Sequence, residues 1–228
     1  MKYSRQEIIN KCEKAFMNIP LLYQEDFINY RGKTNDTDEY YTEVISEYII
    51  ERINEFIEGI PMISRKQGYN VNHDGSYTEG TGRNEEITAI KMFNQCRQGS
   101  EYNYIGKIID YQIPLKASRS DKAGKIDLLS FDGKLARILE LKKPDSDETM
   151  LRCVLEGFTY LCIVDKSLSI KDFELPADTI VKASPFVFVD GVQWQEWKEN
   201  RPYLTRLMEL LDSKAFFIGI EEDRYYVV

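Results

Sequence analysis

The stretch 124–144 constrains the fold more than any other part of the chain. Two apolar runs, Gly124–Phe131 and Leu135–Lys143, flank the dipeptide Asp132-Gly133. An Asp-Gly dipeptide between two apolar runs is a strong signal for the tight turn of a β-hairpin. Both faces of both predicted strands are apolar over most of their length, so we expect a hairpin that is covered on both sides and lies inside a sheet.

Three ionic residues interrupt this apolar pattern at the end of the hairpin away from the turn. Because side chains alternate along a strand, Asp127, Glu140 and Lys142 are predicted to share one face. A two-residue turn pairs Asp127 with Ile138, which makes Asp127 and Glu140 diagonal neighbours ~7–8 Å apart. Burying unpaired charges there costs several kcal/mol. Either both carboxylates hold a divalent cation, or Lys142 forms an ion pair with one of them, and the pattern alone leaves both interpretations open.

The pattern around the hairpin predicts an α/β fold with a central mixed sheet flanked by helices. A helix, three strands, a second helix and a further strand follow one another from residue 84, and a helix and a hairpin close the chain. The predicted elements are a helix over 84–98, strands over 104–115, 124–131 and 135–143, a helix over 145–164 that opens with Asp145 and Glu148, a strand over 179–189, a helix over 194–211 and a hairpin over 216–228.

The chain is predicted to divide into an N-terminal helical extension, a linker and a main domain. Residues 1–67 form the extension, which we expect to pack on the main domain, residues 83–228. Residues 68–82 are rich in turn formers and are predicted to be a loop or linker. They include His73, which in so polar a loop is more typical of a surface position than of a ligand.

The extension is predicted to contain a long helix over 36–60. Asp36 and Glu39 have the spacing of a capping box, in which the carboxylate of the third helical residue bonds the amide of the capping residue. Apolar residues then recur at helical spacing until Pro61, which ends the helix.

The charge distribution is more informative than the total charge. The formal net charge of −8 argues against a protein that coats nucleic acid generally. Residues 115–143 nevertheless hold eight basic residues against four acidic ones. A local excess of this kind can attract a phosphate backbone, although a solvated surface is the ordinary interpretation of such a run.

Several classes of site and location are disfavoured. The chain has a single histidine, and its four cysteines form no CxxC pair, which nearly excludes a multi-histidine zinc site. No apolar run approaches the ~20 residues that span a bilayer, and no apolar core follows the charged N-terminus. We therefore expect a cytoplasmic protein with no membrane partner.

Asp127 and the Glu140-Leu141-Lys142 run on the next predicted strand resemble the PD-(D/E)XK nuclease superfamily, whose fold is restriction-endonuclease-like. The predicted helix before the three strands matches that fold, and Glu86 fits the glutamate that the superfamily often places there. The resemblance covers roughly residues 83–190. Ile126 stands where proline is common in the superfamily's motif.

A second motif of some branches, QxxxY, is partly present on the following helix. Tyr160 matches, but Glu156 replaces the glutamine. An ordinary i,i+4 pair with Arg152 explains Glu156 equally well. Glu156 and Tyr160 are therefore expected to support the site rather than to carry its chemistry.

The resemblance implies hydrolysis of nucleic-acid phosphodiester bonds with Mg²⁺ or Mn²⁺, and DNA is the favoured substrate. Asp127, Glu140, the Leu141 backbone carbonyl and Glu86 would hold the metal, and Lys142 would position the attacking water or stabilise the transition state. A homo-oligomer stays open. The residues expected to contact the nucleic-acid backbone are Lys116, Arg119, Lys122 and Lys125.

Three other functions remain compatible with the same residues. The chain could be an inactive nucleic-acid-binding or interaction module of the same fold, a metal-free acid/base hydrolase, or a protein with a purely structural ion cluster. Lys142 opposes the hydrolase, because a neighbouring ammonium depresses the pKa of a carboxyl group that must act as a general acid. Dependence on a divalent metal separates the nuclease from all three.

Overall fold

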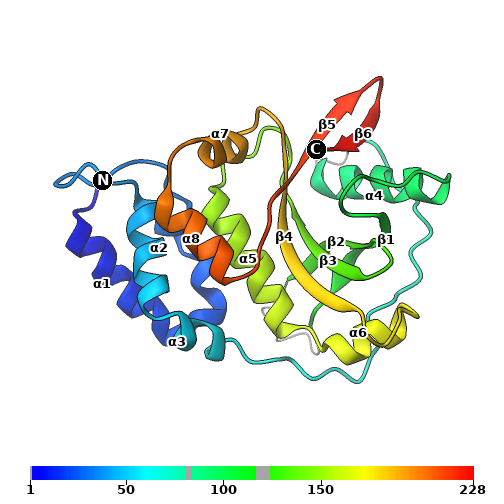
Figure 1. Cartoon of the computed structure of the whole chain (residues 1–228), viewed down its shortest axis with the longest axis horizontal. Helices are drawn as coiled ribbons and strands as arrows, with labels where there is room; N and C mark the ends of the chain where they lie inside the picture. The colour runs from blue at the N-terminus through cyan, green and yellow to red at the C-terminus, as the bar shows by residue number, and fades with distance from the viewer. Residues whose placement is uncertain (1, 81–83, 117–123) are drawn as a thin grey trace.

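In the computed structural model, which describes residues 2–80, 84–116 and 124–228, helices pack on both faces of one six-stranded sheet (Figure 1). The chain is therefore an α/β protein. No helix within the described ranges is long and apolar enough to cross a membrane. The elements are α1 (Arg5–Ala15), the 3-10 helices η1 (Phe16–Gln24) and η2 (Asp26–Asn29), α2 (Tyr41–Glu51), α3 (Ile53–Glu58), α4 (Asn84–Arg97), β1 (Lys107–Pro114), β2 (Lys125–Phe131), β3 (Leu135–Leu141), α5 (Met150–Ile163), α6 (Lys166–Asp172), β4 (Ile180–Phe188), α7 (Val192–Lys198), α8 (Pro202–Leu210), β5 (Phe216–Glu221) and β6 (Arg224–Val227).

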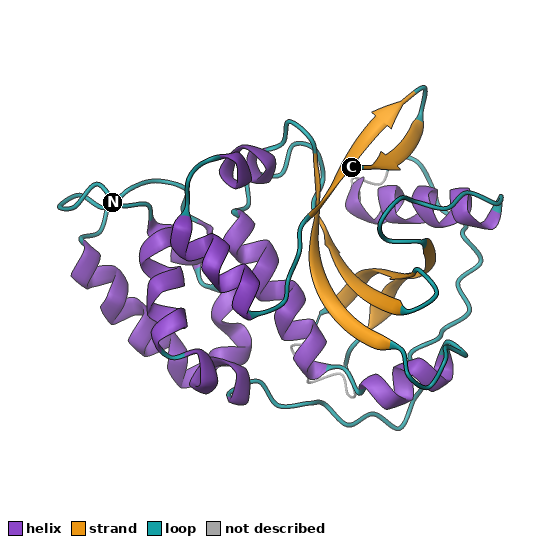
Figure 2. Ribbon diagram, viewed as in Figure 1, coloured by secondary structure: helices purple, strands orange, loops and turns teal. Residues whose placement is uncertain are grey.

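The sheet is mixed and curled (Figure 2). Its strand order follows the chain order from β1 to β6. Strands β1, β2 and β3 form an antiparallel meander, whereas β4 and β5 run parallel to β3. The step from β3 to β4 passes through α5 and α6, since parallel neighbours need a long crossover. Strand β6 pairs antiparallel with β5 as a terminal hairpin, which the sequence pattern predicted.

The β2–β3 hairpin is buried on both faces, as its apolar pattern predicted. Leu129 and Ile138 belong to a core that includes α5 and the N-terminal helices. Leu128 and Leu139 belong to a second core on the opposite face, under α4. The two cores fix the orientation of α4 and α5 relative to the hairpin, and these are the elements that build the candidate site.

The long helix predicted over 36–60 is two helices, α2 and α3. The chain breaks between them at Arg52, whose backbone φ is −124° and ψ is 30°. The predicted capping box is also wrong, because Asp36 accepts a hydrogen bond from the Arg5 amide at 2.9 Å and Glu39 pairs with the Arg5 guanidinium at 3.1 Å. A capping box does occur at the start of α1, where Ser4 and Glu7 bond each other's backbone amides.

The helix predicted over 194–211 is likewise two helices, α7 and α8. Glu199 ends α7 with an extended backbone, and Pro202 begins α8. Proline is favoured at the first position of a helix, and it disfavours helical backbone in the residue before it. The proline therefore explains both the break and the new start.

The described part of the predicted linker, residues 68–80, is docked on the main domain. The Tyr69 amide donates to Asp172 at 2.6 Å. His73 is only partly exposed: its Nδ1 lies 2.7 Å from Asp110 Oδ1, and its ring stacks on Tyr111 with centroids 4.3 Å apart. His73 therefore packs against two residues of β1, the edge strand. It is not the solvated surface histidine that the loop composition favoured.

Candidate active site

Asp127 and Glu140 lie on one face of the sheet, which confirms the predicted alternation. The observed register pairs Leu128 with Leu139 and Leu129 with Ile138. Continued by one residue, this register places Asp127 directly opposite Glu140 rather than diagonal to it. Directly opposite residues are the closest cross-strand neighbours, so the two residues lie closer in the sheet than the predicted diagonal pairing implied.

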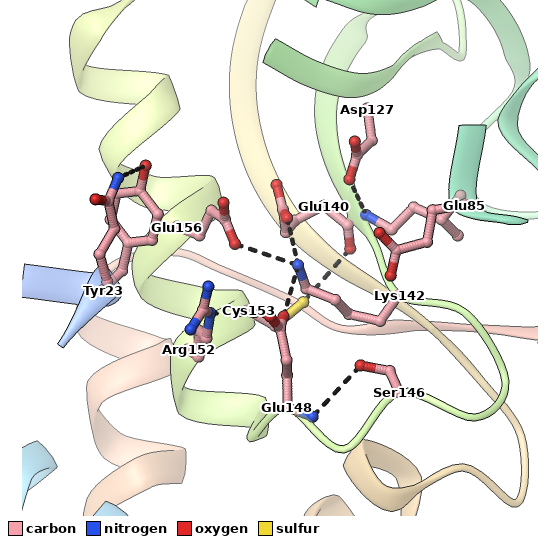
Figure 3. Close-up of polar contacts among 12 residues, drawn as sticks. Tyr23, Glu85, Asp127, Glu140, Lys142, Ser146, Glu148, Arg152, Cys153 and Glu156 are labelled. Atoms are coloured by element: carbon pink, nitrogen blue, oxygen red, sulfur yellow. Dashed lines mark hydrogen bonds and ion pairs between the residues drawn. The ribbon is translucent and has the colours of Figure 1, made fainter. Parts of the chain in front are cut away.

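Lys142 follows β3 and lies at the centre of a buried ionic group (Figure 3). Its Nζ is 2.7 Å from Glu140, 2.8 Å from Glu148 and 3.2 Å from Glu156. The side chains of Lys142 and Glu140 are 6% and 4% exposed, so water does little to screen these charges. We call Asp127, Glu140, Lys142, Glu148 and Glu156 the Lys142 cluster.

Lys142 is positively charged in this arrangement. Burial alone would lower the pKa of Lys142, but Glu140 and Glu156 outweigh burial and hold the pKa well above its ordinary value. A lysine in this state donates hydrogen bonds and does not accept protons. It can therefore stabilise negative charge, and it is unsuited to act as a general base.

Asp127 is held by the strands on either side of it. Its Oδ1 accepts a hydrogen bond from Gln112 Nε2 at 3.0 Å, and its Oδ2 accepts one from the Leu141 amide at 3.0 Å. Burial raises the pKa of Asp127 to about 7, and the charges of Glu156 and Glu85 add to the shift while Lys142 opposes it. Burial also raises the pKa of Glu140 well above its ordinary value. Both shifts mark a site that carries too much negative charge for its surroundings.

The helix α5 supplies Glu156 and approaches the strands closely. A Cβ atom at Gly157 would lie 3.4 Å from the Cβ atom of Glu140, so glycine allows the helix to pack directly over that residue. Glu156 accepts a hydrogen bond from the Tyr160 hydroxyl at 2.9 Å as well as from Lys142. The predicted pair between Glu156 and Arg152 does not form; Arg152 Nε pairs with Glu148 at 3.1 Å instead.

Glu85 is an α4 carboxylate whose contacts place it beside the Lys142 cluster. Its Oε1 accepts a hydrogen bond from the Lys143 amide at 3.1 Å, and its charge raises the pKa of Asp127. The charge of Glu86 instead acts on Tyr111. The pKa of Tyr111 is raised by burial and, to a lesser degree, by neighbouring acidic groups that include Glu86. The structure therefore adds Glu85 as a carboxylate of α4 beside the site, and the role predicted for Glu86 stays a prediction.

The Lys142 cluster has a deficit of positive charge and a free oxygen. With all four carboxylates ionised, the cations Lys142 and Arg152 would leave two negative charges in excess. Glu140 Oε2 is buried and has no hydrogen-bond partner among the described residues. Leaving a buried carboxylate oxygen unpaired is costly. A cation beside Asp127 and Glu140 would remove this cost.

The donor atoms suit Mg²⁺ or Mn²⁺. In the described ranges, no three His, Cys, Asp or Glu side chains converge on one point as a complete metal cage. Mg²⁺ does not require such a cage, since it is usually held by one or two carboxylates and keeps several waters. Asp127 and Glu140 can supply those carboxylates, and the Leu141 backbone lies beside them because its amide donates to Asp127.

Of the four predicted backbone-contacting residues, the structure describes two. Lys116 and Lys125 are exposed, while Arg119 and Lys122 lie outside the described residues. Lys125 has the strand parity of Asp127 and so projects from the same face of β2. Gly124, just before it, lies against the Tyr160 hydroxyl, so the end of the basic segment adjoins the Lys142 cluster.

Sequence reasoning missed three polar residues of the site: Gln112, Glu148 and Arg152. Glu148, Arg152, Glu156 and Tyr160 recur every four residues, a spacing that aligns side chains along one face of a helix. That repeat was a usable signal for the α5 contribution. Nothing in the sequence marked Gln112, which reaches Asp127 from an irregular part of β1 where its φ is +48°.

Comparison with known proteins gives no further constraint: neither a protein-family model, nor a curated protein, nor a solved structure matches the chain.

Proposed function

We propose that the protein is a metal-dependent nuclease with a restriction-endonuclease-like core. The observation that carries this proposal is the Lys142 cluster, in which two cross-strand carboxylates, an unpartnered buried oxygen and a charged lysine lie together. The element order α4–β1–β2–β3–α5–β4, with β4 parallel to β3, supports the same assignment.

Each residue of the cluster has a distinct chemical role in this proposal. Mg²⁺ or Mn²⁺ would supply positive charge that makes water more acidic and stabilises a phosphate transition state. Asp127, Glu140 and the Leu141 carbonyl would hold it, and Glu85 would bind one of its waters. Lys142 acts as a hydrogen-bond donor to the negative charge that develops on the phosphate, because its pKa is held high.

The surroundings of the cluster fit a polyanionic substrate. Exposed Lys125 lies two residues from Asp127 on the same strand face, and the basic segment that precedes it begins at exposed Lys116. Contacts of this kind position a phosphate backbone without reading its sequence. We propose DNA as the substrate on the strength of the motif resemblance.

A catalytically inactive nucleic-acid-binding module is the second candidate. It is favoured by the absence, in the described part of the chain, of three metal-binding side chains that converge on one point. Lys142 would then be a permanent counter-ion for Glu140 and Glu156. This candidate predicts binding of nucleic acid without cleavage in any metal.

The test is cleavage of single- and double-stranded DNA and RNA in Mg²⁺, in Mn²⁺ and in EDTA. The nuclease should cut at least one substrate with metal and none in EDTA. Glu140→Gln keeps the shape of a ligand but removes its charge, so turnover should fall more than ~100-fold. Lys142→Met should still bind metal and nucleic acid while losing turnover. Cleavage that persists in EDTA or in Glu140→Gln would refute the proposal.

A further inference from the structure

The three contacts of Lys142 are not equivalent. Those to Glu140 and Glu156 are hydrogen bonds, at 2.7 and 3.2 Å. The Glu148 Oε2 atom lies 2.8 Å from Nζ, yet it is buried and makes no hydrogen bond in the described structure. A lysine ammonium has three donors. Glu148 Oε2 therefore lies within hydrogen-bond distance of the Lys142 ammonium but accepts no hydrogen bond from it.

Glu148 is fixed from outside the cluster. It lies in the segment between β3 and α5, where Arg152 Nε forms an ion pair with its other oxygen at 3.1 Å, also without a hydrogen bond in the described structure. Its carbonyl accepts a hydrogen bond from Gln193 Nε2 at 2.6 Å, and its amide faces Ser146 Oγ at 3.4 Å. Glu148 can therefore receive Lys142 without moving far.

Under the proposed function, a divalent cation and the Lys142 ammonium compete for the Glu140 carboxylate. A divalent cation and the Lys142 ammonium are both positive, so they cannot share Glu140 without repulsion. A cation on the free Glu140 Oε2 would therefore weaken the bond that Lys142 makes to Oε1 and would favour the other contacts of the ammonium. The contacts that remain to it are Glu156, on α5, and Glu148.

We propose that Glu148 is a positioning residue that, together with Glu156, holds Lys142 when Glu140 binds a divalent cation. This inference rests on the proposed function and adds a role that the motif does not assign. In the metal-free protein Lys142 neutralises Glu140, and Glu148 makes only an ion pair. In the metal-loaded protein Lys142 exchanges its bond to Glu140 for one to Glu148.

The first test compares Mn²⁺ affinity in wild type, Glu148→Gln and Asp145→Asn by calorimetry. Asp145 is a matched control, since it lies in the same segment but pairs with Lys143, at 3.4 Å, on the surface. Glu148→Gln should bind Mn²⁺ about tenfold more weakly, because Lys142 then competes for Glu140; this is the scale for residues that support metal ligands. Asp145→Asn should bind as wild type does.

The second test reads Lys142 directly, by mass spectrometry after brief acetylation with Mn²⁺ present. Lys142 should be protected in wild type and in Asp145→Asn, and modified several-fold faster in Glu148→Gln. In EDTA the three proteins should be modified alike, because Glu140 and Glu156 hold the lysine in each. This readout does not depend on turnover.

The third test is a double-mutant cycle in the Lys142→Met background. Without the lysine, Glu148→Gln should no longer weaken Mn²⁺ binding by tenfold, because its effect acts through Lys142. If the double variant does not fold, the acetylation comparison still decides. Equal Mn²⁺ affinity and equal Lys142 protection in wild type and Glu148→Gln would overturn the inference and leave the nuclease intact. A wild type that binds no Mn²⁺ would overturn both.

Discussion

Two buried ionic groups in this molecule resemble each other in composition and differ in how their charges are balanced. The first is the Lys142 cluster between the hairpin and α5. The second, which we call the Arg201 cluster, joins α2, α7 and α8. There Arg201, itself 3% exposed, donates to Thr42 at 2.8 Å and to Glu199 at 2.6 Å, and lies 3.2 Å from Glu196.

The Arg201 cluster adds backbone amides as partners for its buried acids, although Glu196 Oε1, like Glu140 Oε2, is buried without a hydrogen bond in the described structure. Glu196 accepts a hydrogen bond from the Met150 amide at 2.7 Å, at the start of α5. Nearby Glu43 accepts from the amides of Tyr203 and Leu204, at the start of α8. The N-terminus of a helix favours negative charge, so these carboxylates gain stabilisation beyond the guanidinium.

The Lys142 cluster instead shares one ammonium among three carboxylates. Glu140 Oε2 has no partner in the described structure, and Asp127 has a pKa of about 7 because burial opposes its charge. The comparison teaches that burial of charge alone does not mark a functional site. The difference lies in the partners: backbone amides at two helix starts bind Glu196 and Glu43, whereas the Lys142 ammonium is shared by Glu140, Glu148 and Glu156.

The largest expected effect on stability is at the Arg201 cluster. Arg201→Met leaves Glu196 buried without its cationic partner, so the free energy of unfolding should fall by about 3–5 kcal/mol. Urea denaturation measures this change. Saturating Mn²⁺ should not restore the loss, because the Arg201 cluster has no role for a metal; recovery with Mn²⁺ would erase the distinction between the two clusters.

Lys142→Met should destabilise the metal-free protein by a comparable amount, and Mn²⁺ should reverse most of this loss. Removing the ammonium leaves three carboxylates together, which we expect to cost about 3 kcal/mol in EDTA. A ligand at about 100 times its dissociation constant adds ~2.7 kcal/mol to the folded state, so saturating Mn²⁺ should restore most of the loss. Denaturation curves of the same variant with Mn²⁺ and with EDTA provide the check. A loss that Mn²⁺ leaves unchanged would make Lys142 a structural residue like Arg201.

The pH dependence of stability should report on the Lys142 cluster through Asp127. A carboxyl group whose folded pKa is raised binds more protons in the folded state, so its contribution to stability falls as pH rises through that window. For Asp127 the window runs from its unfolded value, 3.8, to about 7. One pKa unit corresponds to ~1.4 kcal/mol, so metal-free protein should lose about 2 kcal/mol between pH 5 and pH 7 through this group.

Asp127→Asn is the control for that measurement. It should reduce the slope between pH 5 and pH 7 in EDTA, because the amide does not titrate there, and Glu140, whose pKa burial also raises, should account for part of the slope that remains. Mn²⁺ should bind wild type more tightly at pH 8 than at pH 6, since binding must release the proton from Asp127. A variant slope identical to that of wild type would assign the pH dependence to other groups.

The smallest effect is expected at an exposed ion pair, which sets the baseline for both clusters. Arg206 and Glu209 pair at 3.0 Å, with side chains 58% and 60% exposed. Solvent and salt screen such a pair, so Arg206→Gln should change the free energy of unfolding by less than ~0.5 kcal/mol. A larger change would show that charge removal is costly everywhere in this protein, and the cluster comparison would lose its meaning.

The shared face of Asp127 and Glu140 was predictable because it depends only on strand alternation. The exact pairing was not. Asp132 Oδ1 accepts hydrogen bonds from the Lys134 and Leu135 amides, which widens the turn beyond the two residues that the Asp-Gly signal indicated. The register therefore shifts by two residues, and a shift of two preserves which side chains share a face.

The helical residues of the site were harder to predict. Successive residues of a helix differ in direction by ~100°, so choosing Glu85 or Glu86 requires the rotation of α4 on the sheet. That rotation is set by the packing of Ile90 and Phe93 in the second core. The sequence alone does not fix this packing. The sequence pattern places Glu148 at a helix start, whereas α5 begins at Met150 and is capped by the Thr149 side chain.

The most direct test of the central claim, that the Lys142 cluster takes a divalent cation, is a Mn²⁺ titration at pH 8. Wild type, Glu140→Gln and Arg201→Met should be titrated side by side under conditions where all three are folded. We predict saturable binding in wild type and Arg201→Met and its loss in Glu140→Gln. Binding that survives in Glu140→Gln, or its absence from folded wild type, would contradict the account.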